Sequence, residues 1–125
     1  MEERGSKKGY RDLIAWQKGM DLVEEIYKTT QYFPREEMYG LTIQMRRAAV
    51  SVPSNVAEGQ IRSSQKEFSQ FISIALGSCA ELYTQLELSR RLGYMNEKDF
   101  RKTSESINEL MKILHGLRKK VSNHC

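Results

Sequence analysis

The sequence has few of the residues that interrupt helices or cross-link a chain. Two prolines, eight glycines and two cysteines occur among 125 residues. So little proline and glycine excludes collagen, a low-complexity linker and a β-sandwich with many turns. Two cysteines are too few for a disulfide framework, and Cys79 lies in an apolar helical pattern, where a free thiol behaves as a small hydrophobic group. The composition favours a small helical protein in a reducing compartment.

Long apolar runs are missing as well. No stretch reaches the roughly 18 apolar residues of a membrane-spanning helix. The first eight residues also lack the apolar centre of a signal peptide. We therefore expect a cytoplasmic protein with no membrane partner. The length suits one compact domain and excludes a two-domain enzyme.

Apolar residues recur at helical spacing in four segments that short turns separate. We expect Asp12 to cap the first helix and Pro34 to close it. The second helix should have Glu36 and Glu37 near its start, where acidic groups complement the helix dipole, and should stop at Gly59. The third begins at the capping residue Ser64 and ends at Gly93, and the fourth begins at Asn96.

Each helix carries one apolar stripe. Four such helices with short connections predict an all-α, antiparallel up-and-down four-helix bundle. We expect the bundle to span residues 12–121, with tails at 1–11 and 122–125. The expected core stripes are Leu13, Trp16, Met20, Val23 and Tyr27; Leu41, Met45, Ala48, Val52 and Val56; Phe68, Ile72, Ala75, Cys79, Leu82, Leu86 and Ser89; and Phe100, Ile107, Met111, Leu114 and Val121.

The third helix is apolar on a second side, and the first helix repeats this weakly. A helix that is apolar on two sides usually has a partner on each, so a homo-oligomer is expected; the alternative is a monomer with scattered surface apolar residues. Close approach of another backbone would explain a glycine at position 77. The residues off the core stripes are Phe71, Ile74 and Leu88, with Gly77 and Ser78 between them, and Leu22 and Ile26 in the first helix.

Basic residues outnumber acidic residues by 20 to 16, which gives a formal charge of +4. The excess lies in the second helical segment and at the end of the fourth. These regions are either solvated helix faces and a basic chain end, or a surface that contacts phosphates. No aromatic residues interleave with the basic ones, so the class of nucleic acid stays open. The candidate nucleic-acid-binding residues are Arg46, Arg47, Arg62, Arg118, Lys119 and Lys120.

Pro53 lies inside the second helical segment, where proline deletes a backbone hydrogen bond, so we expect a kink near Val52 or a restart there. A polar stripe follows this helix about 100° around from the apolar one. Its groups either pair with one another and hold the helix register or a subunit contact, or they form a ligand or RNA site. The stripe contains Arg47, Ser51, Asn55, Glu58 and Arg62. We call Ser51, Asn55 and Glu58 of this stripe, together with Glu81 of the third helix, the polar seam.

No residue pattern requires catalysis. Glu58 and Glu81 could form a carboxylate pair, but glutamates on neighbouring helices are more often in salt bridges. Arg118 and His124 match the Arg-x(4–6)-His motif of the helical HEPN ribonucleases, within the final eight residues. Neither a metal-ligand spacing nor a phosphate-binding glycine loop occurs. We expect no enzyme, metal, cofactor or small-molecule substrate, with a HEPN-like ribonuclease as the remote alternative.

Several short motifs occur together in a specific order, and Ser51-Val52-Pro53-x-Asn55-Val56-Ala57-Glu58-Gly59 is the most distinctive. The others include Leu13-x-x-Trp16-Gln17, Phe33-Pro34, Tyr39-Gly40-Leu41, Arg46-Arg47-Ala48, Glu67-Phe68, Ala75-x-Gly77-Ser78, Glu81-Leu82 and Leu92-Gly93-Tyr94. From Leu13 to Tyr94 the chain resembles the bacterial 23S rRNA intervening-sequence protein family. The resemblance implies a left-handed bundle that assembles as a homopentamer, and it implies no enzymatic activity. A related pentameric bundle, the accessory variability determinant of diversity-generating retroelements, binds a reverse transcriptase and RNA.

The sequence supports three hypotheses about function. The first is a non-enzymatic oligomeric scaffold that binds structured RNA, or an RNA-binding protein, through its basic residues. The second is a protein-interaction module whose polar seam serves only oligomerisation. The third is the HEPN-like ribonuclease.

Overall fold

The computed structural model describes residues 9–123, and these fold into four long helices and two short 3-10 helices with no strand. The confirmed part of the predicted fold is therefore an all-helical chain with four long helices. The 3-10 helices are η1 (Tyr10–Asp12) and η2 (Arg35–Glu37). The long helices are α1 (Ile14–Thr30), α2 (Leu41–Gln60), α3 (Gln65–Arg91) and α4 (Glu97–Ser122).

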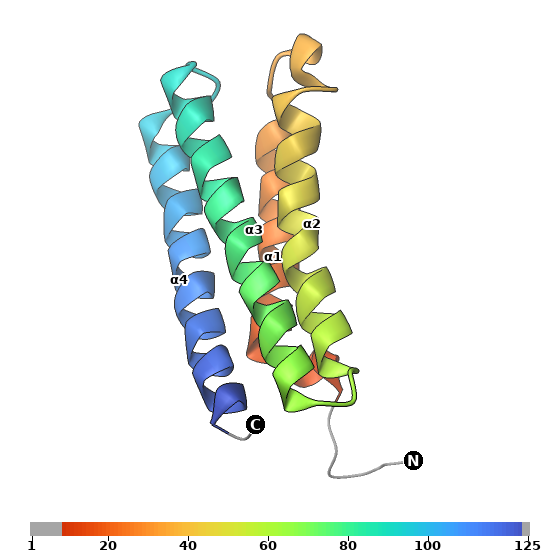
Figure 1. The fold of residues 1–125 in the computed structure, drawn as a ribbon. Helices are drawn as coiled ribbons and strands as arrows, with labels where there is room; N and C mark the ends of the chain where they lie inside the picture. The colour runs from red at the N-terminus through yellow and green to blue at the C-terminus, as the bar shows by residue number, and fades with distance from the viewer. Residues whose placement is uncertain (1–8, 124–125) are drawn as a thin grey trace.

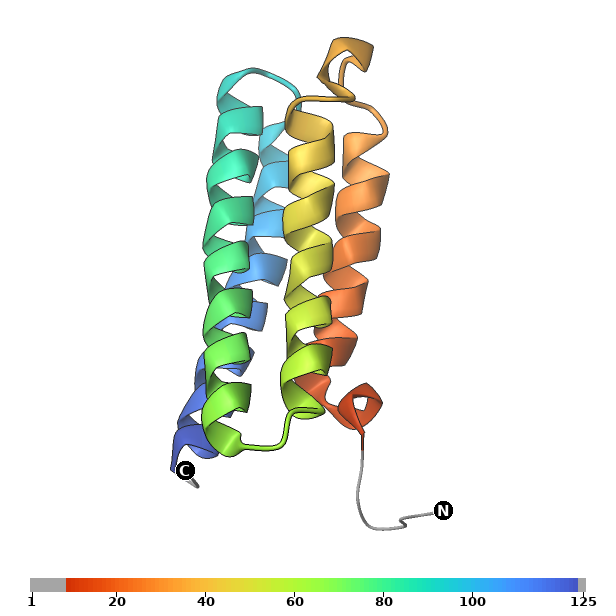
Figure 2. The same ribbon diagram turned by 45° about the vertical axis from the view of Figure 1, so that its right-hand side comes forward.

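The four long helices lie side by side, and the chain reverses direction at each connection (Figures 1 and 2). Helix α2 packs between α1 and α3, and α4 packs against α3 and α1. Helices α2 and α4 are diagonal and make no direct backbone approach. None of the helices within residues 9–123 is long and apolar enough to cross a membrane.

The expected capping residues of α3 and α4 are confirmed. The Ser64 side chain accepts a hydrogen bond from the Glu67 amide at 3.1 Å, and the Asn96 side chain accepts one from the Asp99 amide at 2.8 Å. Gly93 follows the end of α3 with a φ of 82°, the left-handed conformation in which glycine ends helices. Asp12 is different: it belongs to η1, and α1 begins after Leu13 with no side-chain cap.

The predicted core stripe of α1 is wrong at Met20 and Tyr27, whereas Leu13, Trp16 and Val23 are partly buried against the core. Met20 and Tyr27 are 39% and 43% exposed, whereas Leu22 and Ile26, assigned to a second face, are 2% and 0% exposed. The buried side of α1 includes the small residues Ala15 and Gly19, and at Gly19 the helix approaches Pro53 of α2 closely. Leu22 and Ile26 therefore do not support an oligomer. The buried residues of α1 are Ala15, Gly19, Leu22, Ile26 and Thr30.

The other three core stripes are buried or partly buried as predicted. Helix α2 contains Pro53 and continues through it without a restart. It also continues past Gly59 to Gln60, so Gly59 does not end the helix. Its start is Leu41 rather than Glu36 or Glu37, which form the preceding η2 turn.

Two glycines allow the neighbouring helices to approach α2. A Cβ on Gly19 of α1 would lie 3.2 Å from the Cβ of Pro53. A Cβ on Gly59 would lie 2.6 Å from the Cβ of Phe71 of α3. Phe71, which was expected off the core stripe of α3, is half-buried and packs against Gly59.

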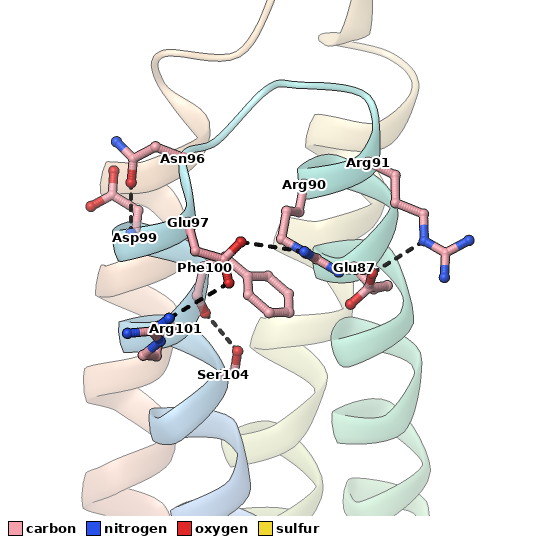
Figure 3. A network of polar contacts seen from close by, with 9 residues as sticks. All are labelled: Glu87, Arg90, Arg91, Asn96, Glu97, Asp99, Phe100, Arg101 and Ser104. Atoms are coloured by element: carbon pink, nitrogen blue, oxygen red, sulfur yellow. Dashed lines mark hydrogen bonds and ion pairs between the residues drawn. The ribbon is translucent and has the colours of Figure 1, made fainter.

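Polar contacts join the helices at the end of the bundle where α1 and α3 finish. The Leu41 amide and the Tyr94 hydroxyl donate hydrogen bonds to the two carboxylate oxygens of Glu37, at 3.0 and 2.8 Å. These bonds hold the pKa of Glu37 below its ordinary value. Arg90 of α3 contacts Glu87 and Glu97 and lies 4.6 Å from the centre of the Phe100 ring, which ties α3 to α4 (Figure 3).

We expect Gly59→Ala to lower the free energy of unfolding by about 1–3 kcal/mol, because its new methyl group would overlap Phe71. Gly116→Ala is the matched control: Gly116 lies within α4 with no atom within 4 Å of a Cβ, so stability should rise by up to about 1 kcal/mol. Urea unfolding followed by circular dichroism measures both. Equal effects of the two substitutions would contradict the close packing of α2 on α3.

We expect Tyr94→Phe to raise the pKa of Glu37 toward its ordinary value, because one of its two hydrogen-bond donors is lost. The folded pKa stays lowered by the Leu41 amide, the largest cause. A lowered folded pKa stabilises the protein above the ordinary glutamate pKa, and this stability disappears as the pH falls through the folded value. An NMR titration of the Glu37 carboxyl carbon tests this, with Tyr32→Phe as control. An unchanged Glu37 pKa in Tyr94→Phe would contradict the contact.

Candidate nucleic-acid interface

The six basic candidates do not form one surface. Arg46 and Arg62 are sixteen residues apart in the sequence, which is about 24 Å along a helix. The three candidates in α4 lie on a helix whose backbone does not approach that of α2 closely. The candidates therefore divide into two groups at different levels of the bundle.

The first group is Arg62, Arg118, Lys119 and Lys120, and it lies where α2 and α4 finish and α3 begins (lower part of Figure 1). Lys66 of α3, which was not among the candidates, lies at the same end, and we call these five residues the basic end. Arg62 lies 4.8 Å from the centre of the Phe71 ring, and Arg118 donates a hydrogen bond to the Ser73 hydroxyl at 3.1 Å. These two contacts place both arginines against the first half of α3, one from the connection between α2 and α3 and one from α4.

The acidic residues at the basic end come from α2 and α3, as Glu58 and Glu67, and the end of α4 contributes none. Between Leu110 and Asn123 the chain has four cationic residues and no acidic one. Lys119 and Lys120 are exposed, and neither has an ion pair within residues 9–123. Arg62 pairs with Glu58 at 2.7 Å, but both side chains are largely exposed, and such pairs contribute less than about 1 kcal/mol. Arg62 therefore stays accessible to a phosphate.

The second group is Arg46 and Arg47, which lie on the outer side of α2 next to α1. Arg46 donates hydrogen bonds to the Thr30 hydroxyl at 2.9 Å and to the Tyr27 carbonyl at 3.4 Å. Its guanidinium also lies 4.4 Å from the centre of the Tyr27 ring. Arg46 thus binds the end of α1, where a cation complements the helix dipole. Arg47 is exposed and has no hydrogen bond or ion pair within the described part of the chain.

The polar seam is partly assembled. The hydroxyls of Ser51 and Ser78 are 2.8 Å apart and join α2 to α3. The Asn55 amide donates to the Ser51 carbonyl at 2.8 Å and to the Ser51 hydroxyl at 2.9 Å. These three residues satisfy one another, which agrees with the structural interpretation of the seam. Glu58 and Glu81 lie outside this network.

No carboxylate pair forms between Glu58 and Glu81 in the structure. Glu58 pairs with Arg62, and Glu81 accepts a long hydrogen bond of 3.5 Å from Gln85. Of the HEPN-like pair, Arg118 contacts His115 Nδ1 at 3.2 Å, and His124 lies outside the described residues, as does Cys125. Burial raises the pKa of the Cys79 thiol to about 11, which keeps it protonated and unreactive.

A groove elsewhere on the bundle is lined mainly by acidic residues. It lies between the second half of α1 and the first half of α4 and has a volume of about 630 Å³. Four carboxylates and two lysines line it, so its field repels polyanions. Thr103 donates a hydrogen bond to Glu25 across it at 2.9 Å. The charged lining residues are Asp21, Glu24, Glu25, Asp99, Lys28 and Lys102.

Sequence reasoning missed Tyr27 as a site residue. Its spacing placed it in the core of α1, whereas the structure exposes it beside Arg46. The bundle therefore does bring an aromatic ring next to two arginines, although the sequence shows no such interleaving. The residue pair is separated by nineteen positions, so only the packing of α1 on α2 could reveal it.

Comparisons with known proteins agree with this fold. The model of the 23S rRNA-intervening sequence protein family matches residues 11–116. The crystal structure of a protein with unknown function from the S23 ribosomal protein family of Bacteroides thetaiotaomicron has a TM-score of 0.79 and 21% identity, and the match covers 85% of this chain and 96% of that one. At that identity the likeness shows the fold alone. No curated protein matches the chain.

Proposed function

Since the chain belongs to the 23S rRNA-intervening sequence protein family, we propose that it is a non-enzymatic, oligomeric four-helix bundle that binds structured RNA. The observation that carries the proposal is the basic end. Four of its five cations are exposed and Arg118 is half-buried, and they gather at one end, while the carboxylate-lined groove is formed by the second half of α1 and the first half of α4. Figure 2 shows that these two halves lie toward the opposite end of the bundle. Phosphates attract such a surface, and the attraction must weaken as salt concentration rises.

The proposal includes assembly of identical subunits, with five as the number that the family resemblance implies. The supporting observation is the outer face of α3, where Ile74 and Leu88 are 51% and 46% exposed. Gly77 lies between them, and a Cβ added to it would have no atom within 4 Å, so a second copy can approach there. An assembly would repeat the basic end several times and strengthen its field.

Three finer features are proposed on the same basis. They are the left-handed sense of the bundle, a kink of α2 at Pro53 and a cytoplasmic location. The kink has a physical reason, because Pro53 supplies no backbone donor in the middle of α2. The other two follow from the family resemblance and from the composition.

We expect the double substitution Lys119→Gln/Lys120→Gln to weaken binding of an RNA hairpin and to reduce the slope of log affinity against log salt by about one per lysine. Lys28→Gln/Lys98→Gln is the matched control, because it removes the same charge from exposed residues at the opposite end of the bundle. Fluorescence anisotropy across a salt series measures both. Equal losses in the two variants, or no binding by the unmodified protein at low salt, would contradict the proposal.

We expect Gly77→Gln to reduce the mass in solution toward the 14.5 kDa of one chain. A bulky side chain in a close interface costs about 1–3 kcal/mol per contact. Gly116→Gln adds the same side chain at another exposed helical glycine and should leave the mass unchanged. Light scattering coupled to size exclusion measures the masses. An unmodified protein of 14.5 kDa, or an unchanged mass for Gly77→Gln, would show that α3 is not a subunit contact.

A further inference from the structure

A second, smaller groove runs between α1 and α2, away from the basic end. Its volume is about 340 Å³, at the lower end of the roughly 300–1,000 Å³ of small-ligand sites. No carboxylate lines it, and its two charged residues are both arginines. The lining residues are Tyr27, Ile43, Arg46, Arg47, Val50 and Ser51.

The groove contains a preformed cation–π pair. The Arg46 guanidinium lies over the Tyr27 ring, 4.4 Å from its centre. The hydrogen bonds to Thr30 and to the Tyr27 carbonyl fix the guanidinium in place, so little freedom is lost when a ligand binds. Aromatic rings and arginine planes are the surfaces on which unpaired RNA bases stack.

The neighbouring residue, Arg47, is available to bind a ligand. Arg47 is exposed and unpaired within residues 9–123, whereas Arg46 is committed to α1. A guanidinium binds a phosphate through two parallel hydrogen bonds. One arginine thus belongs to the stacking surface, and the next in the sequence can hold the phosphate. The apolar side chains of Ile43 and Val50 provide the remaining wall for a base or sugar.

We propose that this groove binds a single unpaired nucleotide, with the base stacked on Tyr27 and Arg46 and the phosphate on Arg47. This inference rests on the proposed function and deepens it, because it names the part of the RNA that the protein selects. Duplex RNA would bind at the basic end through its phosphates alone. RNA with a bulge or a loop would make an additional contact, between its unpaired nucleotide and the α1–α2 groove. The larger groove between α1 and α4 is unsuitable because four carboxylates line it.

The alternative occupant is a second copy of the chain, since Tyr27 and Val50 are exposed apolar residues. Two adjacent guanidiniums without an acidic neighbour favour a phosphate-bearing ligand over an apolar interface core, from which charge is usually excluded. The two occupants also make different predictions for the mass of a variant in solution.

The test compares a blunt RNA duplex with the same duplex containing one bulged adenosine, using fluorescence anisotropy on the full chain. The unmodified protein should bind the bulged RNA about tenfold more tightly, as expected for one stacked base. Tyr27→Leu should abolish this preference and leave the affinity for the blunt duplex unchanged. Tyr32→Leu is the matched control, because Tyr32 is 81% exposed and lies in the acidic groove.

Arg47→Gln provides a second variant, because an exposed residue without partners can be replaced without affecting folding. Arg47→Gln should weaken binding of the bulged RNA more than binding of the blunt duplex. Lys28→Gln should not change this preference. Equal binding of the two RNAs by the unmodified protein overturns the nucleotide site and leaves the proposed function standing. No binding of either RNA overturns both. A fall in solution mass for Tyr27→Leu assigns the groove to a second copy and also overturns the nucleotide site.

Discussion

The close approach of α2 to its two neighbours is the constraint on which the rest of the structure depends. Gly19 leaves room for Pro53 on one side of α2, and Gly59 leaves room for Phe71 on the other. Helix α1 meets α2 at the first of these contacts. Because it packs through Gly19, Tyr27 emerges at the edge of α2 and meets Arg46. The α1–α2 groove is thus a consequence of helix packing.

The same packing explains what the sequence could and could not predict. Caps at Ser64 and Asn96 depend on neighbouring residues only, so they were predictable. The core stripes of α2, α3 and α4 were predictable too, and α3 has in addition the exposed apolar residues Ile74 and Leu88 on its outer face. Helix α1 has two possible core stripes at similar spacing. A prediction from apolarity alone chooses the stripe with the larger residues, which runs through Met20 and Tyr27. The structure buries the other, because Gly19 allows the closer contact.

The residues of the candidate site were also predictable only in part. Charge counts identified the basic C-terminal part of α4, since its cations are consecutive in the sequence. Charge counts could not show that Arg46 donates a hydrogen bond to Thr30 while Arg47 is exposed and has no partner among the described residues. The two arginines are neighbours in the sequence and differ only in the direction in which they leave α2. The polar seam was recognisable as a stripe, but only the packing of α3 shows that Ser51 meets Ser78 and that Glu58 does not join them.

The central claim is that RNA contacts two separate places: the basic end through phosphates, and the α1–α2 groove through an unpaired base. Ultraviolet cross-linking of the protein to the bulged RNA, with mass spectrometry of the cross-linked peptides, tests it most directly. The account predicts cross-links at Tyr27 of α1 and none at Tyr32, which lies only five residues further along the chain. Cross-links at Tyr32, or cross-links confined to the basic end, would contradict it.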